Sequence, residues 1–406
     1  MSTHPSIVII GGGAAGFFAS IIAAQNSPKS AVTLFEKSKQ LLTKVRISGG
    51  GRCNVTHSCF EPKQLVLNYP RGGKALLGPF SRFQPLDTIE WFNKHDVDLK
   101  TEADGRMFPT TDSSETIAQC LMEAANESHV KIRTLVSLTA IKPLESGFIL
   151  TVGNDESIHC DRLLMASGSN TKIWNLLAGL GHTIIPPVPS LFTFNVPNSP
   201  LSELAGISVE KVEAKIQGTP LKQTGPLLIT HWGFSGPAIL KLSAWGARLL
   251  HEKAYKATLQ VNWLPEMSLS DLKEMLLRFK ISSPARLLVN EGPDKIPRKL
   301  WKKLAERAGA SATLRWSHLS SALLQKLILE LSASEFKIEG KTTYKEEFVT
   351  CGGVALDEID FKTMQSKKIP NLYFSGEVLD IDGVTGGFNF QNAWTTGFIA
   401  GKSISV

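Results

Sequence analysis

The segment SIVIIGGGAAGFFASIIAAQ, residues 6–25, decides the fold of this chain. A run of apolar residues rich in β-branched side chains, Ile7 to Ile10, precedes three glycines and an alanine-rich stretch. Strands of a parallel sheet that is covered on both faces are continuously apolar, so this run predicts a buried parallel strand. We expect the chain to turn sharply after it into a helix from Ala14 to Ala24 that packs closely on the sheet.

Two other interpretations of this segment are unfavourable. A signal peptide carries basic residues ahead of its apolar core, whereas the first Lys or Arg here is Lys29, behind that core. A transmembrane helix needs about twenty apolar residues without helix breakers, and four glycines interrupt this run near its middle. The segment is therefore predicted to be neither a secretion signal nor a membrane anchor.

Gly11, Gly13 and Gly16 have the G-x-G-x-x-G spacing of dinucleotide-binding turns. The first glycine allows the tight turn, the second lets the backbone approach a pyrophosphate, and the third lets helix and strand pack closely. A second strand, in VTLFEK, ends at Glu36, where a carboxylate accepts hydrogen bonds from an adenosine ribose. An ordinary strand-turn-helix with a surface glutamate is the alternative, but this combination favours a dinucleotide cradle.

Composition predicts a soluble intracellular protein of more than one domain. A length of 406 residues exceeds the chain length that a single hydrophobic core usually supports, so two or three domains are expected. Five cysteines, an odd number without a C-x-x-C pair, favour reduced thiols in a cytoplasm. The same pattern disfavours a structural zinc site, any other metal site, and a redox disulfide of the disulfide-reductase type.

The net charge of +7 is concentrated in one segment. Between Leu269 and Glu330 there are twelve Lys or Arg against six Asp or Glu. This surplus is typical of a solvated basic helix face, and it also suits an acidic partner or an anionic substrate.

The pattern of elements changes twice along the chain. The first 190 residues alternate strand-like segments, among them VKIRTLVSLTAI and SIHCDRLLMASG, with helix-like segments, which indicates an α/β sheet. The proline-rich IPPVPSL at Ile185 to Leu191 marks a boundary. Residues 191–264 are β-rich and residues 265–345 mainly helical, with Leu300, Trp301, Leu304, Ala305 and Ala308 spaced as the core face of a helix. Strand and glycine character then returns. We therefore expect one α/β domain, 1–190 with 346–406, split by an inserted domain, 191–345.

Three further glycine-rich segments are candidates for the same site. In SGGGRCN, Ser48 to Asn54, Arg52 can pair with a phosphate and Asn54 with a polar ring edge; a mobile surface loop is the alternative. In LLMASGSN, the small residues Ala166, Ser167 and Gly168 follow an apolar strand and permit close passage over a cofactor.

The third segment is YFSGEVLDIDGVTGGFNFQNAWTTG, Tyr373 to Gly397. Here Gly386 and Gly387 precede a predicted helix, FNFQNAWTTGFIA, whose first N–H groups would suit the charge on a reduced flavin ring near its N1 and O2. A plain structural use of glycines at a helix start is the alternative.

These motifs resemble one family closely. IIGGGAAG, KVRISGGGRCNVT, DGRMFPTTD, LITHWGFSGPAILKLS and the long stretch from VTCGG to FNFQNAW are similar to the BaiN/RdsA-type (YhiN-like) family of NAD(P)/FAD-dependent flavoproteins. The likeness runs over essentially the full length. It implies an α/β fold with a Rossmann-like FAD-binding domain, split in sequence, and an inserted β-barrel-like plus helical domain.

The resemblance also implies which residues would hold FAD. The pyrophosphate would lie against Gly11, Gly13, Ala14, Ala15 and Gly16, the adenosine ribose against Glu36, and the adenine against Leu138. The middle of the cofactor would be lined by Lys37, Lys44, Ser48, Gly50, Gly51, Arg52, Cys53, Asn54 and Thr56, and its flavin end by Gly376, Glu377, Asp382, Gly386, Gly387, Phe388, Asn389 and Gln391. Two departures stand out: Phe388 replaces the usual tyrosine, and ASGSN replaces the usual ATGG.

The reaction predicted is hydride or electron transfer at a flavin on a small organic substrate. With one dinucleotide fingerprint rather than two, NAD(P)H would be a transient electron donor. His231 is a candidate proton donor and Arg106 a candidate binder of an anionic substrate, although a packed histidine and a structural salt bridge are equally good interpretations. A flavoprotein that acts on tRNA and a non-catalytic flavin-binding protein are the alternatives. Nucleic acid is the less favoured partner, because the basic residues show no aromatic interleaving.

Overall fold

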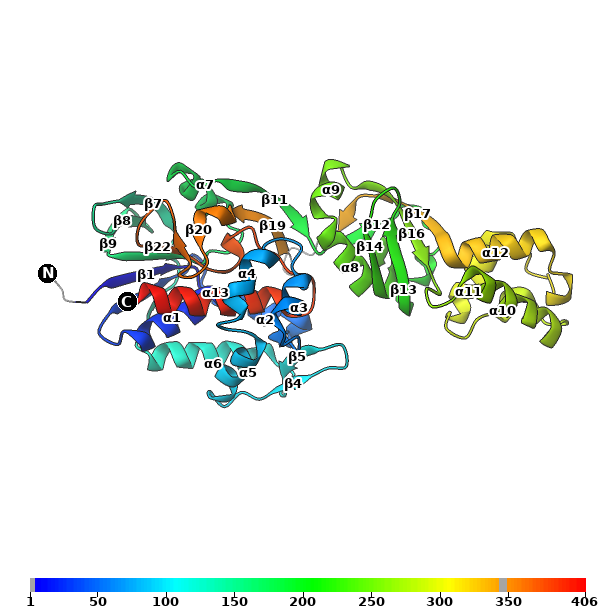
Figure 1. Cartoon of the computed structure of the whole chain (residues 1–406), viewed down its shortest axis with the longest axis horizontal. Coiled ribbons are helices and arrows are strands. Elements are labelled where there is room, and N and C mark those ends of the chain that lie inside the picture. The colour runs from blue at the N-terminus through cyan, green and yellow to red at the C-terminus, as the bar shows by residue number, and fades with distance from the viewer. Residues whose placement is uncertain (1–3, 343–348) are drawn as a thin grey trace. The chain divides into compact units, whose positions relative to one another are not determined.

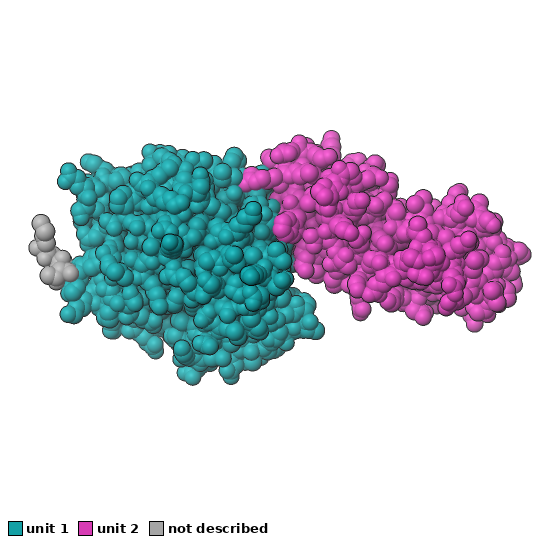
Figure 2. All heavy atoms as spheres, in the orientation of Figure 1, with its two compact units in different colours: residues 1–189, 345–406 teal, residues 190–344 magenta. Residues whose placement is uncertain are grey.

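The computed structural model describes residues 4–342 and 349–406, which form two compact units. The first consists of Met1–Pro189 with Lys345–Val406 and the second of Ser190–Tyr344 (Figure 2). Both ends of the chain thus contribute to the first unit, and the middle of the chain forms the second.

A seven-stranded sheet organises the first unit, in the order β20-β21-β22-β10-β1-β2-β6. From β22 to β6 the neighbouring strands are parallel, and β20 and β21 add an antiparallel edge. The residues Ile7 to Ile10 are buried, as the apolar run predicted. The strands are β1 (Ser6–Ile10), β2 (Ala31–Phe35), β6 (Lys131–Arg133), β10 (Arg162–Met165), β20 (Ile359–Asp360), β21 (Gln365–Ser366) and β22 (Leu372–Phe374).

Two helices from opposite ends of the chain, α1 (Ala14–Asn26) and α13 (Phe388–Ile404), pack side by side (Figure 1). A side chain at Gly401 would come within 2.7 Å of the Ala19 carbonyl oxygen and one at Gly397 within 3.1 Å of the Ala15 carbonyl oxygen, so glycine permits the close approach. The other α-helices of this unit are α2 (Thr43–Gly51), α3 (Pro62–Leu65), α4 (Gly73–Phe80), α5 (Pro85–Asn93), α6 (Ser114–Glu127) and α7 (Thr171–Gly179).

Three small sheets complete the first unit, and they correct two sequence interpretations. VKIRTLVSLTAI and SIHCDRLLMASG, each expected as one strand, both divide between the main sheet and a small one. The first breaks at Leu135, which has a φ of 60°, and the second at Asp161, whose carboxylate accepts a hydrogen bond from the Ser6 N–H at 2.6 Å. The small sheets contain β3 (Thr56–His57), β4 (Leu99–Thr101) and β5 (Arg106–Pro109); β7 (Leu138–Pro143), β8 (Phe148–Val152) and β9 (Glu156–Cys160); and β11 (Ile184–Ser190) with β19 (Val349–Val354).

The second unit is built on a sheet in the order β17-β16-β13-β14-β15-β12-β18. The sheet curls, because β15 and β17 are not neighbours in it, yet the ring centroids of Phe234 on β15 and Phe336 on β17 are 4.7 Å apart. Its strands are β12 (Thr193–Asn195), β13 (Ser208–Ile216), β14 (Lys222–Thr230), β15 (Gly233–Ser235), β16 (Lys256–Asn262), β17 (Ser334–Glu339) and β18 (Lys341–Thr342), and its helices are α8 (Pro237–Trp245), α9 (Ala247–Glu252), α10 (Leu269–Ser282), α11 (Arg298–Ala308) and α12 (Ser321–Ala333).

Within the second unit, helices also occur in the expected β-rich part and strands in the expected helical part. The expected β-rich part contains α8 and α9, and the expected helical part ends in β17 and β18, which belong to the sheet. Helices α10 to α12 are therefore an insertion between two strands, β16 and β17, that pair with each other. Pairing of strands that are far apart in sequence leaves no local signal.

The predicted core face of α11 is confirmed, because its buried residues are Leu300, Trp301, Leu304, Ala305 and Ala308. We expect Leu304→Ala to lower the free energy of unfolding of this unit by about 2–5 kcal/mol, since it removes buried methyl groups and leaves a cavity. Tryptophan fluorescence during urea unfolding measures this, because Trp301 and Trp316 stack 6.2 Å apart in the same core. Lys302→Ala, on the exposed face, is the control, and equal losses in the two variants would contradict the assignment.

Candidate functional site

The glycine turn before α1 encloses an open space. Gly11 has a φ of 118°, and its N–H donates to the Phe35 carbonyl oxygen at 2.8 Å. A side chain on Gly11 would overlap Ala166, and one on Gly16 would overlap Gly11 itself, so both positions require glycine. A side chain on Gly13, by contrast, would meet no protein atom within 4 Å. The space lies at the start of α1, where no side chain caps the helix and no acidic residue occupies the first turn.

Glu36 lies at the end of β2, beside this turn. Its carboxylate accepts hydrogen bonds from the Gly12 N–H at 2.8 Å and from the N–H and hydroxyl of Ser38 at 2.9 and 2.7 Å. The Val136 N–H donates to the Glu36 carbonyl oxygen at 2.9 Å, which brings the start of β7, with the buried Leu138, to the same side. Lys37 is exposed. Glu36 and Leu138, predicted from distant motifs, are thus near each other.

A second place where segments distant in sequence meet lies at the end of β10, beside a short 3-10 helix, η6 (Gly376–Val378). A side chain on Gly376 would come within 2.8 Å of the Ala15 side chain, so η6 abuts the start of α1. Lys44 of α2 forms an ion pair with Glu377. The Glu377 carboxylate also accepts the Thr350 N–H at 3.0 Å and lies 3.6 Å from the position of a side chain on Gly168.

The SGGGRCN segment forms the kinked end of α2 and the turn after it. Ser48, Gly49 and Gly50 leave helical geometry, and side chains on Gly50 and Gly51 would meet nothing within 4 Å. Cys53 is buried, which raises the pKa of its thiol to about 12 and keeps it protonated. The open face of these two glycines is a further place where a ligand can approach the backbone.

The guanidinium of Arg52 in this segment is engaged by protein groups. It donates to Glu102 at 2.7 Å and lies 4.0 Å from the centre of the Phe108 ring. The hydrogen bond to Glu102 raises the pKa of Arg52. Contact of Arg52 with a phosphate stays a prediction. In such a contact the guanidinium would bind the phosphate and the Glu102 carboxylate at the same time.

The start of α13 meets β3 and the end of SGGGRCN. With its amide oxygen towards Gly387, Asn54 accepts the Gly387 N–H at 3.0 Å and donates to the Thr56 carbonyl oxygen at 3.1 Å. Buried Gln391 accepts hydroxyl hydrogen bonds from Thr56 at 2.6 Å and Thr88 at 3.0 Å and donates to Thr395 at 3.0 Å. These groups position the helix start, and Gln391 contacts protein rather than an open space.

Other residues that the family resemblance placed at the flavin end also have protein partners. Asn389 donates to and accepts from the backbone of Gly383 at 2.9 and 2.8 Å. The Phe388 ring is 3% exposed; it stacks on His57 with ring centroids 4.7 Å apart and lies beside Gly386. Asp382 has no exposed surface and forms an ion pair with Arg71. Their contact with a cofactor stays a prediction, while their structural contacts are established.

The two candidate catalytic residues lie in different units. Arg106 on β5 donates to Asp104 at 2.7 Å and to Glu102 at 2.9 Å, so two carboxylates already surround it. His231 is exposed in the turn between β14 and β15 of the second unit. The roles of both residues stay predictions.

The residues around the glycine turn suit FAD. Next to the turn at Gly11, the Ser167 hydroxyl is buried without a hydrogen-bond partner among the described residues, and the side-chain oxygen of Asn392 on α13 is buried without one as well. Buried polar groups normally have partners, so orphaned ones beside a cradle indicate a polar ligand. Sequence reasoning missed Asn392, although it lies in the third glycine-rich segment, because it follows the glycines and lies in the interior of a helix.

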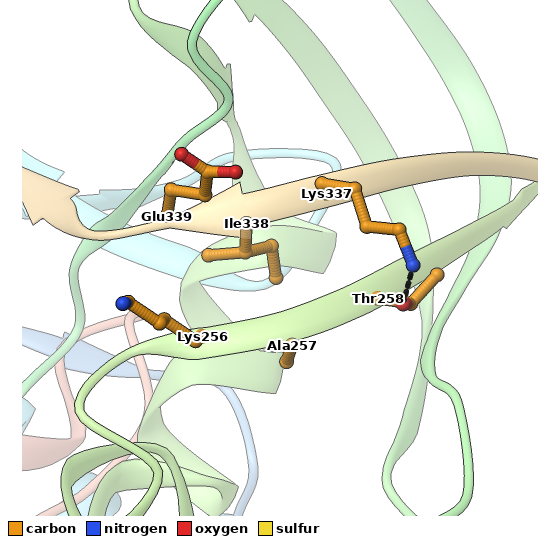
Figure 3. A pocket seen from close by; sticks show the side chains of 6 residues that line it. All are labelled: Lys256, Ala257, Thr258, Lys337, Ile338 and Glu339. Carbon is orange, nitrogen blue, oxygen red and sulfur yellow. Dashed lines mark hydrogen bonds between the residues drawn. The ribbon is translucent and has the colours of Figure 1, made fainter.

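Two hollows were identified on the individual units. One of about 300 Å³ on the first unit is lined by Ser169, Thr171, Trp174, Pro187, Val188, Pro189 and Thr350. It adjoins the candidate site, because Ser169 follows Gly168 and the Thr350 N–H binds Glu377. The other, of about 350 Å³, lies between β16 and β17 of the second unit (Figure 3), where Lys337 donates to the Thr258 hydroxyl at 3.0 Å. Its lining contains none of the predicted site residues.

A buried ionic network supports the far edge of the sheet. His182 Nδ1 binds Glu358 at 2.8 Å, and its Nε2 lies 3.1 Å from the Ser366 hydroxyl. Burial lowers the pKa of His182 despite Glu358. Burial alone would raise the pKa of Glu358, but hydrogen bonds from Lys368, Thr183 and His182 outweigh it and hold that pKa at about 2.

This network predicts loss of stability in acid. Because His182 in the folded protein binds its proton less readily than in the unfolded chain, stability falls as pH drops below about 6.5. The contribution of Glu358 is complete above about 4.5 and is lost as pH falls towards 2. We expect urea midpoints at pH 7.5 and 5.5 to differ less for His182→Asn than for the unchanged protein. Equal differences would contradict a role for His182.

No helix within 4–342 and 349–406 has the length and apolar character needed to cross a membrane. Within the same residues, no three or more His, Cys, Asp or Glu gather in a way that could hold a metal ion.

The class of the protein follows from the fold and the site. A parallel sheet, a glycine turn before α1 and an acidic residue that ends β2 define a Rossmann-like dinucleotide-binding domain. Within that class, the chain belongs to the HI0933-like family, because the family model described as HI0933-like protein Rossmann domain matches residues 5–403. The family suggested by the sequence motifs is therefore confirmed.

Similar proteins cover nearly the whole chain. The ribosomal RNA dihydrouridine synthase of Escherichia coli (strain K12) is 30% identical over 408 residues, which is 98% of this chain and 97% of that relative. The 3-dehydro-bile acid delta(4,6)-reductase of Clostridium scindens is 28% identical over 407 residues, 98% of each. Among solved structures, a 3-ketosteroid-delta4-(5alpha)-dehydrogenase from Rhodococcus jostii RHA1 has a TM-score of 0.53 at 13% identity, over 99% of this chain and 97% of that one. The last likeness shows the fold alone.

Proposed function

We propose that this protein uses FAD to reduce a carbon–carbon double bond that is conjugated to a carbonyl group. The observation that supports this most is chemical. The names of two relatives, a dihydrouridine synthase and a reductase of a 3-dehydro-bile acid with double bonds at positions 4 and 6, describe reductions of this one kind of bond. In uracil the C5–C6 double bond is conjugated to the C4 carbonyl, and in the bile acid the double bonds are conjugated to the 3-keto group.

The residues of the first unit have defined roles in this proposal. The open face of Gly13 and the start of α1 hold the pyrophosphate, Glu36 holds the ribose, and the unpartnered Ser167 hydroxyl and Asn392 oxygen bind polar groups of the cofactor. When bound, FAD supplies the hydride that reduces the substrate. Gln391 and Asn54 keep the start of α13 in place.

The hollow lined by Trp174 and Pro187 to Pro189 receives the flat ring that exchanges electrons with the flavin. It is bounded by an aromatic ring, prolines and the hydroxyls of Thr171 and Thr350, and it adjoins Glu377. NAD(P)H is the electron donor in this proposal and docks transiently, because the sequence carries one dinucleotide fingerprint. Protonation of the substrate by His231 belongs to the same proposal.

A uracil base in RNA is the favoured substrate. The relative with the higher of the two identities acts on ribosomal RNA by its name, and the second unit carries the surplus of basic residues that a polyanion would meet. A small conjugated ketone, which falls within the small organic substrates expected from the sequence, is the second candidate, and the bile acid reductase supports it.

Anaerobic mixing tests the proposal. NADH or NADPH is added to the FAD-bound protein, and the flavin absorbance is expected to bleach within seconds. Ribosomal RNA, or 4-androstene-3,17-dione as a model conjugated ketone, is then added, and return of the absorbance with reduction of the double bond identifies the substrate. Bleaching by neither donor would overturn NAD(P)H as donor, and failure of both acceptors to reoxidise chemically reduced flavin would overturn the reaction itself.

A further inference from the structure

The second unit presents a tryptophan to solvent on a rigid turn. Trp232 is 66% exposed, and His231 beside it is exposed as well. Most tryptophans bury their large apolar surface, so an indole left in water marks a binding surface more often than a bulky aliphatic residue does.

Hydrogen bonds fix the backbone of this turn while the indole stays free. The Val196 N–H donates to the Trp232 carbonyl oxygen at 2.7 Å, and the Gly233 N–H donates to the Thr230 hydroxyl at 3.1 Å. Gly233 has a φ of 151°, and a side chain there would overlap the Phe194 backbone, so strand β12 packs directly under the turn. The turn therefore holds Trp232 outwards at little further cost in conformational entropy.

The second unit also carries the basic helix α11, which lies with α10 and α12 (Figure 1). A short 3-10 helix, η2 (Ser202–Leu204), links α11 to the strand before the turn: Glu203 forms an ion pair with Lys303 of α11, and the Gly206 N–H donates to the Ile229 carbonyl oxygen at 2.9 Å. Ile229 is three residues before Trp232 in sequence. Trp232 and α11 are thus connected through a single short segment.

Helix α11 has more positive charge than its neighbours neutralise. It contains Arg298, Lys299, Lys302, Lys303 and Arg307 against one acidic residue, Glu306. Lys303 pairs with Glu203, Arg307 with Glu330, and Lys302 lies 4.0 Å from Glu306. Arg298 and Lys299, both exposed, add charge at the start of the helix, where the helix dipole increases the positive potential.

We propose that Trp232 and the exposed basic residues of α11 form an RNA-binding surface, in which the indole stacks on an unpaired base and the cations contact phosphates. This inference rests on the proposed function, and it assigns the RNA contact to the second unit. An aromatic platform next to a basic stripe is the arrangement that single-stranded nucleic acids require. The sequence interpretation considered only the basic residues themselves, and the structure adds an exposed Trp232 in the same unit, linked to α11 through residues 202–206.

Fluorescence anisotropy with a labelled 20-nucleotide oligouridine and the FAD-bound protein tests the surface. Trp232→Ala is expected to weaken binding by about 5- to 150-fold, the range of a lost base–aromatic stack, and Trp232→Phe is expected to retain most of the affinity. The matched control is Trp245→Ala, at the end of α8, where the tryptophan is 40% exposed. In Lys299→Gln/Lys302→Gln, the slope of log affinity against log salt is expected to fall by about 1.4, the value for two lost phosphate contacts on a single strand.

The outcomes separate this inference from the proposed function. Equal binding by Trp232→Ala and Trp245→Ala, or no binding by the unchanged protein, overturns the surface even if the flavin chemistry succeeds. Selective loss in Trp232→Ala supports the surface even if uracil is never reduced. Thermal unfolding followed by circular dichroism verifies that each variant is folded, and bleaching by NAD(P)H should be unaffected by all of them.

Discussion

Gly13→Val protein is expected to purify folded but without FAD. The position has an extended φ of −93°, which valine adopts readily, and a side chain there would meet no protein atom within 4 Å. The protein alone can therefore accommodate valine, while a pyrophosphate at the start of α1 cannot. Loss of two charge-assisted hydrogen bonds at about 1.5–3 kcal/mol each would weaken FAD binding by about 100-fold or more.

Flavin absorbance of the purified protein, before and after incubation with excess FAD, measures this effect. Gly78→Val is the matched control, because a side chain on Gly78 of α4 would also meet nothing within 4 Å, yet it lies outside the cradle. Gly16→Ala serves as a contrasting variant. Its side chain would overlap Gly11, so we expect the protein to misfold rather than to lose FAD selectively. If Gly13→Val and Gly78→Val retain FAD equally, the cradle does not hold the pyrophosphate.

Asp382→Ala is expected to lower the free energy of unfolding by about 3–5 kcal/mol, the cost of removing one partner of a buried ion pair. Asp382 is 0% exposed and accepts a hydrogen bond from Arg71 Nε at 2.5 Å, so the variant leaves the guanidinium without its carboxylate. Urea unfolding of the protein measures the loss. The exposed pair of Arg133 and Glu156 supplies the control: Glu156→Ala is expected to cost at most about 1 kcal/mol, as surface ion pairs do.

A double variant distinguishes a structural role from a flavin contact. Arg71→Met/Asp382→Leu removes both charges, so it should be more stable than Asp382→Ala if the pair acts through the fold. If Asp382→Ala unfolds like the unchanged protein but shifts the flavin spectrum, Asp382 contacts the cofactor and the structural role is wrong.

Much of the first unit could be predicted from short stretches. The strand Ile7 to Ile10, the turn at Gly11 and Gly16 and the helix after it follow from local rules, because the residues that need one another lie within one turn. The face of α11 was readable for the same reason, since helical spacing places its apolar residues on one side. The family follows from motifs distributed over the whole length.

The partners of the candidate site residues could not be predicted in this way. Asp382 pairs with Arg71, Glu377 with Lys44, and Gln391 with Thr56 and Thr88, each across several hundred residues of sequence. Nothing in the sequence around a carboxylate or amide indicates which distant residue will form its ion pair or hydrogen bond. Placing these groups at a flavin relied on the family, and only the folded chain shows that several of them bind other protein groups.

The amino-acid sequence alone determined the elements whose stabilising contacts are local: the parallel strand, the glycine turn and the amphipathic helices. Tertiary structure alone decided the contacts between the two ends of the chain, the division of two predicted strands between sheets, and the link from α11 to the β14 strand through residues 202–206. The physical reason is that periodicity and turn chemistry act over a few residues, whereas hydrogen bonds and ion pairs between distant segments form only once the sheet has brought them together.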